Sequence, residues 1–425
     1  MNAEETLQEW FPLSFQAYLK QDWPNAVLHM GRPLVVWRSA EGTWFAQDDM
    51  CPHKLAPLSD GSITATGDAI RCSLHGWQFQ GCGTCSMIPS LPANASIPGN
   101  KKYAVRSFPI RQRGDCLWIW MDPSVPPDEN HPRMQDASWE LKNGYQRELP
   151  YSWDFLFENI LDPTHVAYAH CGVGKEFNRT EVDDIRENHV TNLQTRSNNL
   201  GVQLKFDRTI NGRTANETWD FLYPGVWFLR RNTSETGPAG VIVASPIDTN
   251  RVRIMSGQYN PNPPPETKKK QSWKAKLQRQ IFTVVFHRSL NKFFNSDAFL
   301  LRYPQDLIAA ACSENSNPLS HYELASPADQ GTVAFRRWHR QRLGGKLPMA
   351  NPSLLPKIPR QIHCRTHGRT TQQQHYYDTT TGGGFLGTAY AILQQLFASI
   401  SHGTTGQCGI GSSGSFGGSK VVAGS

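Results

Sequence analysis

The sequence predicts an α+β protein with two folded parts, and three observations along its 425 residues lead to this prediction. Short runs rich in Val, Ile, Trp and Phe lie between Gly and Asp turns up to about residue 121, a pattern typical of β-strands. A loop rich in Pro, Asp and Asn follows at residues 122–136. Beyond it come a helix-like segment, a series of strand-like runs and further helix-like segments, which together favour the α+β class.

The expected elements divide the chain into three regions. The first, residues 8–122, should be all-β, with strands at 32–39, 42–47, 77–79, 103–110 and 116–121. The second, residues 140–340, should begin with a helix at 153–170, continue with strands at 198–209, 214–222, 226–231, 240–244 and 251–259, and end with helices at 268–295 and 305–311. Residues 363–425 are of low complexity, and a flexible tail is expected there.

Composition narrows the possible functions. The chain is 38% hydrophobic and 19% charged, which is enough to bury a core. Its net charge of +7 is modest and lacks the dense basic patches of a nucleic-acid reader, so an acidic protein partner or a weakly anionic membrane surface fits better. No transit peptide is visible at the amino terminus. No run reaches the roughly 20 apolar residues that span a bilayer, and residues 385–400 are interpreted as an amphipathic or buried helix.

The strongest motif is a pair of short Cys/His clusters. Cys51 and His53 stand in CPH, and after eighteen further residues Cys72 and His75 stand in CSLH. Nine cysteines without a secretory signal favour metal ligation over a disulfide scaffold. Two thiolates and two imidazoles could hold zinc. However, both clusters lie in a β-rich stretch, which favours a Rieske [2Fe-2S] cluster, where two Cys bind one iron, two neutral His bind the other, and the reduction potential is raised.

A second metal site is indicated by FENILDPTHVAYAH, which contains Glu158, Asp162, His165 and His170. Non-haem iron that activates dioxygen commonly uses two His and one carboxylate and leaves positions open for oxygen. A five-residue gap places two residues of an ideal α-helix about 140° apart, so the helix must widen or end between the histidines. Asp162 precedes His165 by three residues and is expected to lie on its face and orient it.

The third ligand of this site must come from elsewhere in the sequence. Asp306, in YPQDLIAAACSE, is the predicted ligand, because an unpaired carboxylate beside so many apolar residues would be costly to bury. Its alternative interpretation is an Asp that is already satisfied at the start of a helix. Asp297 and Glu314 are the next candidates.

Four further features of the sequence need an interpretation. Cys82 and Cys85, in GCGTC, form either a local redox pair or part of a tight glycine turn, and the sequence does not separate these. Trp77 is expected to pack in the core. Core packing is also favoured over the wall of a large flat pocket for an aromatic group that consists of Trp219, Phe221, Tyr223, Trp227 and Phe228. A solvated face is favoured over a docking surface for the lysine-rich segment 268–279.

These motifs together resemble the Rieske non-haem iron oxygenases, and specifically the pheophorbide a oxygenase and chlorophyllide a oxygenase branch. The resemblance runs from about Trp10 to Trp338, and it is carried by FPLSFQAYL, CPHKLAPLSDG, CSLHGWQFQGCGTCSMIPS, ENILDPTHVAYAH and SPADQGTVAFRRW. The GCGTC and AFRRW runs favour the pheophorbide type. The resemblance implies an amino-terminal Rieske domain followed by a helix-grip catalytic domain, usually in a homotrimer. It also implies that Asp162 links His165 to a cluster histidine of the neighbouring subunit.

The function expected on this basis is oxygenation of a chlorophyll-derived tetrapyrrole by O2, with electrons from reduced ferredoxin. The resemblance favours pheophorbide a in chlorophyll breakdown, with [2Fe-2S] and mononuclear Fe(2+) as cofactors. It implies a chloroplast location (thylakoid or envelope) or a cyanobacterial cell, with peripheral membrane contact left open. The alternatives are oxidation of a side chain of chlorophyllide a or protochlorophyllide, and an electron carrier or redox sensor of chloroplast import without turnover.

Overall fold

The structure is a computed structural model. It describes residues 5–92, 95–97, 99, 101–129, 141–170, 189–210, 213–231, 240–259, 273–311 and 317–350. The expected tail at 363–425 and the candidate ligand Glu314 lie outside the described residues, as do the side chains of the lysine-rich segment 268–279. None of the described helices combines the length and the apolar character needed to cross a membrane.

Three small antiparallel sheets make up the amino-terminal region over its described residues. One sheet has the order β1 (Trp10–Phe15), β11 (Cys116–Trp120), β10 (Ile110–Arg113). A second has the order β2 (Asn25–His29), β3 (Arg32–Arg38), β4 (Trp44–Asp48), β9 (Ser107–Phe108). The third has the order β5 (Ser62–Ile63), β6 (Ala69–Arg71), β7 (Gln78–Gln80), β8 (Cys85–Met87). A short 3-10 turn at Glu5–Leu7 precedes β1, and others at Gln16–Tyr18, Leu58–Asp60 and Lys101–Tyr103 lie between strands.

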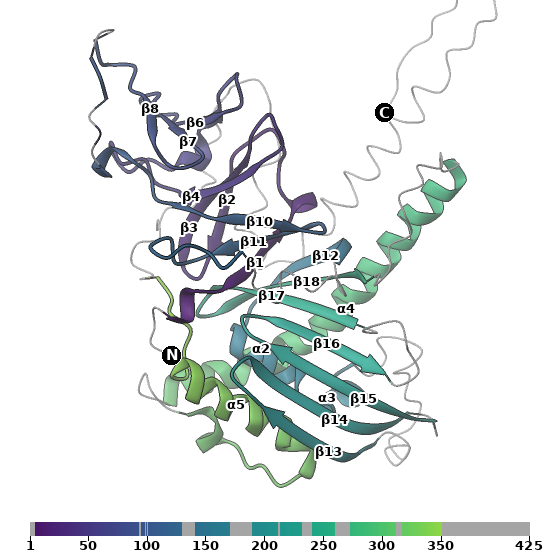
Figure 1. Ribbon diagram of the computed structural model, residues 1–425. Helices are drawn as coiled ribbons and strands as arrows, with labels where there is room; N and C mark the ends of the chain where they lie inside the picture. Colours follow the sequence, from purple (N-terminus) through teal and green to yellow (C-terminus); the bar gives the residue numbers. More distant parts are fainter. Residues whose placement is uncertain are drawn as a thin grey trace, which may run out of the picture. The chain divides into compact units, whose positions relative to one another are not determined.

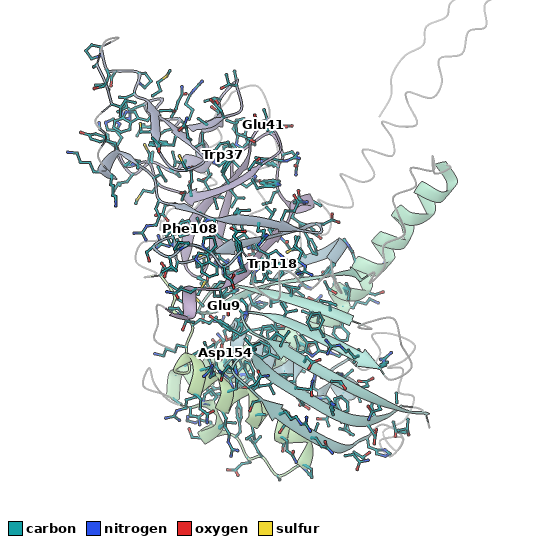
Figure 2. The ribbon with its side chains drawn as sticks, viewed as in Figure 1. Glu9, Trp37, Glu41, Phe108, Trp118 and Asp154 are labelled. Atoms are coloured by element: carbon teal, nitrogen blue, oxygen red, sulfur yellow. The ribbon has the colours of Figure 1, made fainter. Side chains whose placement is uncertain are left out.

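Strand β3 shows how the sequence builds this region. Its side chains alternate between two buried clusters, since successive residues of a strand point to opposite faces. Leu34 and Val36 face the large core that contains Phe108, whereas Trp37 (labelled with Phe108 in Figure 2) belongs to a separate cluster. That second cluster also contains Cys51 and Cys72. The core of the small sheets therefore holds both cysteines of the first motif.

The second region is built on one antiparallel sheet of seven strands among the described residues. Its order is β12 (Leu141–Leu149), β18 (Arg251–Tyr259), β17 (Gly240–Asp248), β16 (Val226–Arg231), β15 (Arg213–Leu222), β14 (Gly201–Ile210), β13 (His189–Ser197). The sequence predicts β16 and β18 with the bounds observed, whereas β12 and β13 are not predicted. Both faces of the sheet are covered: Phe228, Val243 and Met255 contact Trp118 and Trp120 of β11, and the other face carries the helices.

Four helices are described in this region: α2 (Trp153–Ile160), α3 (His165–Ala169), α4 (Trp273–Ala311) and α5 (Gln330–Leu343). Figure 1 shows α2, α4 and α5 against the seven-stranded sheet, and 3-10 turns at Pro318–His321 and Pro327–Asp329 precede α5. The observed arrangement confirms the predicted α+β class, with an all-β region followed by strands covered by helices. The predicted domain bounds of 8–122 and 140–340 stay a prediction.

The helices differ from the sequence-based expectation at two places. The helix expected at 153–170 is two helices, because Pro163 lacks an N–H and restricts the residue before it. The two helices expected at 268–295 and 305–311 are one, α4, which continues through Pro304. Helix α5 begins close to the break between α2 and α3, since a Cβ on Gly331 would lie 1.9 Å from the carbonyl oxygen of Leu161. The break between α2 and α3 is where the second motif lies.

Candidate metal centres

The loops that carry the first motif have the same backbone hydrogen bonds. Cys51 donates its N–H to the carbonyl of Ala56, and Leu55 donates back to the carbonyl of Cys51. In the second loop, at the same spacing, Cys72 donates its N–H to the carbonyl of Trp77, and Gly76 donates to the carbonyl of Cys72. The fifth residue of each loop has a left-handed φ, 60° at Leu55 and 74° at Gly76. Glycine adopts that conformation without strain, whereas Leu does so rarely.

The side chains of these loops divide into buried sulfurs and exposed imidazoles. Cys51 and Cys72 are 1% and 2% exposed, whereas His53 and His75 lie at the surface. The two imidazole rings approach edge to face, with centroids 4.5 Å apart. His53 also stacks on Trp77 with centroids 4.7 Å apart and planes 6° apart. Trp77 is thus buried, as predicted, and also supports one of the histidines.

The two cysteine sulfurs share a hydrogen bond, and their surroundings favour a thiolate at Cys72 and a protonated thiol at Cys51. The pKa of Cys72 is lowered to about 6, first by its hydrogen bond with Cys51 and then by the backbone N–H groups of Leu74 and His75. The pKa of Cys51 is raised, because the two sulfurs share a proton and the second proton leaves an already charged pair. Metal ligation removes both protons, and the backbone N–H groups that point at each sulfur then stabilise the thiolates.

The spread of the four side chains argues against a single zinc ion. Ligands of one tetrahedral zinc lie about 3 to 4 Å apart. Among the described residues, one group of three or more His, Cys, Asp or Glu has ligand atoms that all lie within 4.8 Å of one another, and it contains none of these four residues. Two ligands on each of two irons account for the wider spread. The residues present fit a Rieske cluster.

The compact group is instead the second site, formed by His165, His170 and Asp297. His165 begins α3, and His170 follows its last residue with φ −101° and ψ 17°, outside the helical region. The helix therefore ends between the histidines, as the five-residue spacing predicts. As a result the two rings, which an uninterrupted helix would separate, have centroids 5.3 Å apart.

Hydrogen bonds determine which nitrogen of each imidazole faces the centre of the group. His165 Nδ1 lies 2.5 Å from the backbone carbonyl of Asp162, which can only accept, so Nδ1 carries the proton. Ser296 donates its hydroxyl to the carbonyl of Phe293 and therefore accepts from His170 Nδ1, at 2.7 Å. In both neutral rings the Nε2 lone pair is thereby left for a metal.

Burial keeps both imidazoles neutral and makes Asp297 costly without a cation. Burial lowers the pKa of His165 and lowers the pKa of His170 to about 3, where His165 adds to the effect. Burial raises the pKa of Asp297 to about 7, against a hydrogen bond from Asn159. Asp297 is 4% exposed, and among the described residues its Oδ1 has no hydrogen-bond partner. Its Oδ2 lies 3.7 Å from His170 Nε2, within the roughly 3 to 4 Å that separates two ligands of one metal ion.

The structure does not bring the predicted ligand Asp306 into this group; the carboxylate that lies with the two histidines is Asp297, one of the next candidates. Both residues lie in α4, nine positions apart. On an ideal helix that spacing is about 13.5 Å along the axis and about half a turn around it, which places the two side chains on opposite faces. Asp306 is 53% exposed in its side chain and forms an ion pair with Arg302 at 2.7 Å.

The remaining acidic residues of the motif have other contacts. Asp162 is half-buried, and its Oδ1 accepts from the N–H and the hydroxyl of Thr164, so the group that orients His165 is the Asp162 backbone and not its carboxylate. Glu158 forms a buried ion pair with Arg336 of α5. The expectation that the Asp162 carboxylate orients His165 is therefore corrected.

The structure also shows where the aromatic group and the Cys82/Cys85 pair lie. The buried aromatic side chains belong to cores: Phe221 and Tyr223 pack against Trp153 and Trp338, and Phe228 faces β11 on the other side of the sheet. Cys82 is exposed and Cys85 is buried, and neither forms a disulfide. Sequence reasoning missed Ser296, although its place next to Asp297 in the apolar run FFNSDAFLL was an available signal.

Comparison with known proteins agrees with this geometry. Residues 9–109 match the Rieske [2Fe-2S] domain. Flavonoid 8-hydroxylase 2 of Ocimum basilicum is 28% identical over 84% of this chain and 69% of its own. Pheophorbide a oxygenase of Arabidopsis thaliana is 35% identical over 38% of this chain, and the match spans about a third of that relative (32%). The crystal structure of dicamba monooxygenase bound to dicamba has a TM-score of 0.57 at 18% identity, covers 80% of this chain and 97% of its own, and supports the fold. Residues 9–109 are therefore a Rieske [2Fe-2S] domain, and beyond them the chain is similar in sequence to pheophorbide a oxygenase and in fold to dicamba monooxygenase.

Proposed function

We propose that this chain oxygenates a planar multi-ring substrate at an iron held by His165, His170 and Asp297. The observation that carries the proposal is the group of these three side chains, which is buried except for the partly buried His165 and has both imidazoles turned so that Nε2 faces the metal position. Two His and one carboxylate suit Fe(II) and leave coordination positions open for dioxygen and substrate chemistry. In this proposal Cys51, His53, Cys72 and His75 hold the [2Fe-2S] cluster.

The chain's own residues have defined tasks in this reaction. The Asp162 carbonyl and Ser296 hold the imidazoles, while Asp297 supplies the negative charge that Fe(II) needs. His53 and His75 are exposed, so cluster histidines can contact another protein surface. We propose that the Asp162 carboxylate, which is half-buried, accepts such a contact from a second copy in a homotrimer and carries the electron path between the centres.

The substrate is proposed from the relatives. A tetrapyrrole, with pheophorbide a first and the side chains of chlorophyllide a or protochlorophyllide as alternatives, is supported by the 35% identity to pheophorbide a oxygenase. A flavonoid is the second candidate, because flavonoid 8-hydroxylase 2 matches more of the chain, 84%. Reduced ferredoxin as electron donor is also part of the proposal. A chloroplast location is proposed because both relatives are described as chloroplastic.

One assay separates these candidates. The reduced protein is incubated with ferredoxin, ¹⁸O2 and, in parallel, pheophorbide a, chlorophyllide a, protochlorophyllide and a flavonoid, and products are identified by mass. Incorporation of ¹⁸O into a tetrapyrrole that is absent in the His165→Ala variant supports the first candidate, and incorporation into the flavonoid supports the second. Cluster reoxidation by dioxygen without any oxygenated product, together with two irons per chain, would instead support an electron carrier.

A further inference from the structure

A buried ionic group of the sheet lies next to the turn that carries His165. Arg208 of β14 is 8% exposed, and its Nε lies 3.3 Å from the Glu217 carboxylate of β15. The same carboxylate accepts from the indole of Trp219 at 3.0 Å and forms an ion pair with Arg231 of β16 at 3.1 Å. Glu217 is therefore held by two hydrogen bonds, from Trp219 and Arg231, and by an ion pair with Arg208.

Arg208 extends this group to the second metal centre. Its Nη2 donates to the carbonyl of Pro163 at 3.1 Å. Pro163 stands between Asp162, whose own carbonyl fixes the His165 ring, and His165 itself. Because Pro163 breaks the chain between α2 and α3, the helices' own hydrogen bonds do not hold its peptide unit, and the contact from Arg208 supplies one.

The guanidinium is suited to this position. It lies over the rings of Phe206 and Trp219, 5.5 Å and 5.0 Å from their centroids, and its planar fork reaches an anion on one side and a carbonyl on the other. Burial lowers the pKa of Arg208, and the carboxylates of Glu217 and Asp162 oppose that shift. Arg208, which the sheet residue Glu217 holds in place, therefore donates a hydrogen bond to the turn that carries His165.

We propose that Arg208, fixed by Glu217, is a positioning residue that holds the Asp162–His165 turn so that His165 meets His170 and Asp297 in metal-binding geometry. This inference rests on the proposed function of that site and adds a residue to it that touches neither metal nor substrate.

The test compares Arg208→Gln with Arg231→Gln in the full chain. Both changes remove one cation from Glu217, but only Arg208 has a described hydrogen bond to the turn. The mononuclear site is emptied by a chelator under conditions that leave the Rieske signal unchanged, and Co²⁺ binding is then measured by absorption. We expect Arg208→Gln to weaken Co²⁺ binding about 10- to 100-fold, the range for residues that orient metal ligands, and Arg231→Gln to change it less than about threefold.

The outcomes distinguish the inference from the proposed function. Equal weakening in both variants would overturn the inference, since the effect would then come from Glu217 and not from the contact with Pro163; unchanged binding in Arg208→Gln would overturn it too. If Arg208→Gln cannot be purified with an intact Rieske cluster, Arg208→Lys is measured instead. Wild-type Co²⁺ affinity in Arg208→Lys would contradict the proposal that a guanidinium must contact Glu217 and Pro163 together. Absence of stoichiometric Co²⁺ binding in the wild-type protein would contradict the proposed function itself.

Discussion

His165 and His170 present the same ring nitrogen for two different reasons. A backbone carbonyl holds the first ring, and a serine hydroxyl that is itself committed to a carbonyl holds the second. Neither arrangement uses an ionisable group, so the tautomers do not change with pH. Asp297 is then the single carboxylate of the group, and its burial makes the charged form costly unless a cation lies beside it.

Replacing Asp297 by Ala should release the mononuclear iron and leave the Rieske cluster unchanged. Two neutral imidazoles do not balance the charge of Fe(II) or define its open positions. We expect iron per chain to fall from about three to about two with a normal Rieske electron-resonance spectrum. The matched control is Asp306→Ala, from the same helix, which should keep about three irons. Loss of the third iron in Asp306→Ala but not in Asp297→Ala would restore Asp306 as the ligand.

Replacing Asp162 by Asn should keep both centres and stop turnover. The backbone carbonyl that orients His165 is unchanged, and an amide can still accept from Thr164. The change removes the charge proposed to connect the centres, so turnover should be lost while the iron content stays the same. Iron counting beside single-turnover reoxidation of the cluster checks this, and near wild-type reoxidation would remove Asp162 from the electron path.

The two histidines of the candidate site could be predicted from the sequence, whereas the carboxylate beside them could not. The five-residue spacing of His165 and His170 predicts that the helix widens or ends between them, and the structure has an end there, because this inference needs only local geometry. The choice between Asp297 and Asp306 needs the rotation of α4 against α3. That rotation depends on tertiary packing of Phe293 and its neighbours against His170, with ring centroids 3.5 Å apart, which spacing along the chain does not encode.

At the level of elements, α2 is held in place by α5 through a buried ionic contact. Arg336 of α5 is 3% exposed, pairs with Asp154 and Glu158 of α2, and lies over the ring of Phe155. Asp154 is labelled in Figure 2. Since α2 leads directly into the turn that carries His165, this contact fixes the direction from which the turn begins.

Arg336→Met should therefore destabilise the protein strongly. Removing Arg336 leaves two half-buried carboxylates of α2 without their cation, which should cost about 3 kcal/mol of unfolding free energy, the low end for breaking a buried ion pair. The control is Arg337→Met, at the exposed neighbouring position, for which a change within about 0.5 kcal/mol is expected. Urea unfolding followed by circular dichroism measures both, and equal effects would show that the charge cluster does not anchor α2.

Strand β13 and helix α5 are not predicted from the sequence, because neither has a regular pattern of apolar residues. Strand β13 lies at the edge of its sheet and is mostly exposed, so no alternation of apolar residues marks it. Helix α5 buries Arg336 and His339 among its aromatic residues, so charged residues interrupt its apolar face. Strand β16 begins with the buried apolar run Val226–Phe228, and β18 contains buried Val252, Ile254 and Met255, so both carry an apolar signal that β13 and α5 lack.

At the level of the whole molecule, the small sheets and the large sheet share hydrogen bonds. Met30 and Gly31, which follow β2, donate to the carbonyls of Pro246 and Ile247 in β17. Beside them His29 is completely buried, with Nδ1 3.0 Å from the hydroxyl of Ser245. A second buried histidine, His339, packs between Phe335 and Trp153. Burial lowers the pKa of His29 to about 3 and that of His339 to about 4.

These two histidines should make the protein less stable as the pH falls below about 6.5. Each takes up a proton near its ordinary pKa in the unfolded chain but stays neutral in the folded protein down to pH 4 or below, so acid favours unfolding. Each contributes at most about 1.4 kcal/mol per pH unit in this window. The melting temperature measured from pH 7 to 4.5 should fall less steeply in His339→Phe than in wild type, and parallel curves would contradict a neutral buried imidazole.

The iron content of the purified chain, read beside its Rieske electron-resonance spectrum, bears most directly on the proposal of two separate metal centres. We expect about three irons per chain, two of them in the cluster. A chelator should remove the third alone, and Fe(II) should restore it in the wild type but not in His165→Ala. Two irons per chain, both within the cluster, or a third iron that rebinds equally in His165→Ala, would contradict a mononuclear centre at His165, His170 and Asp297.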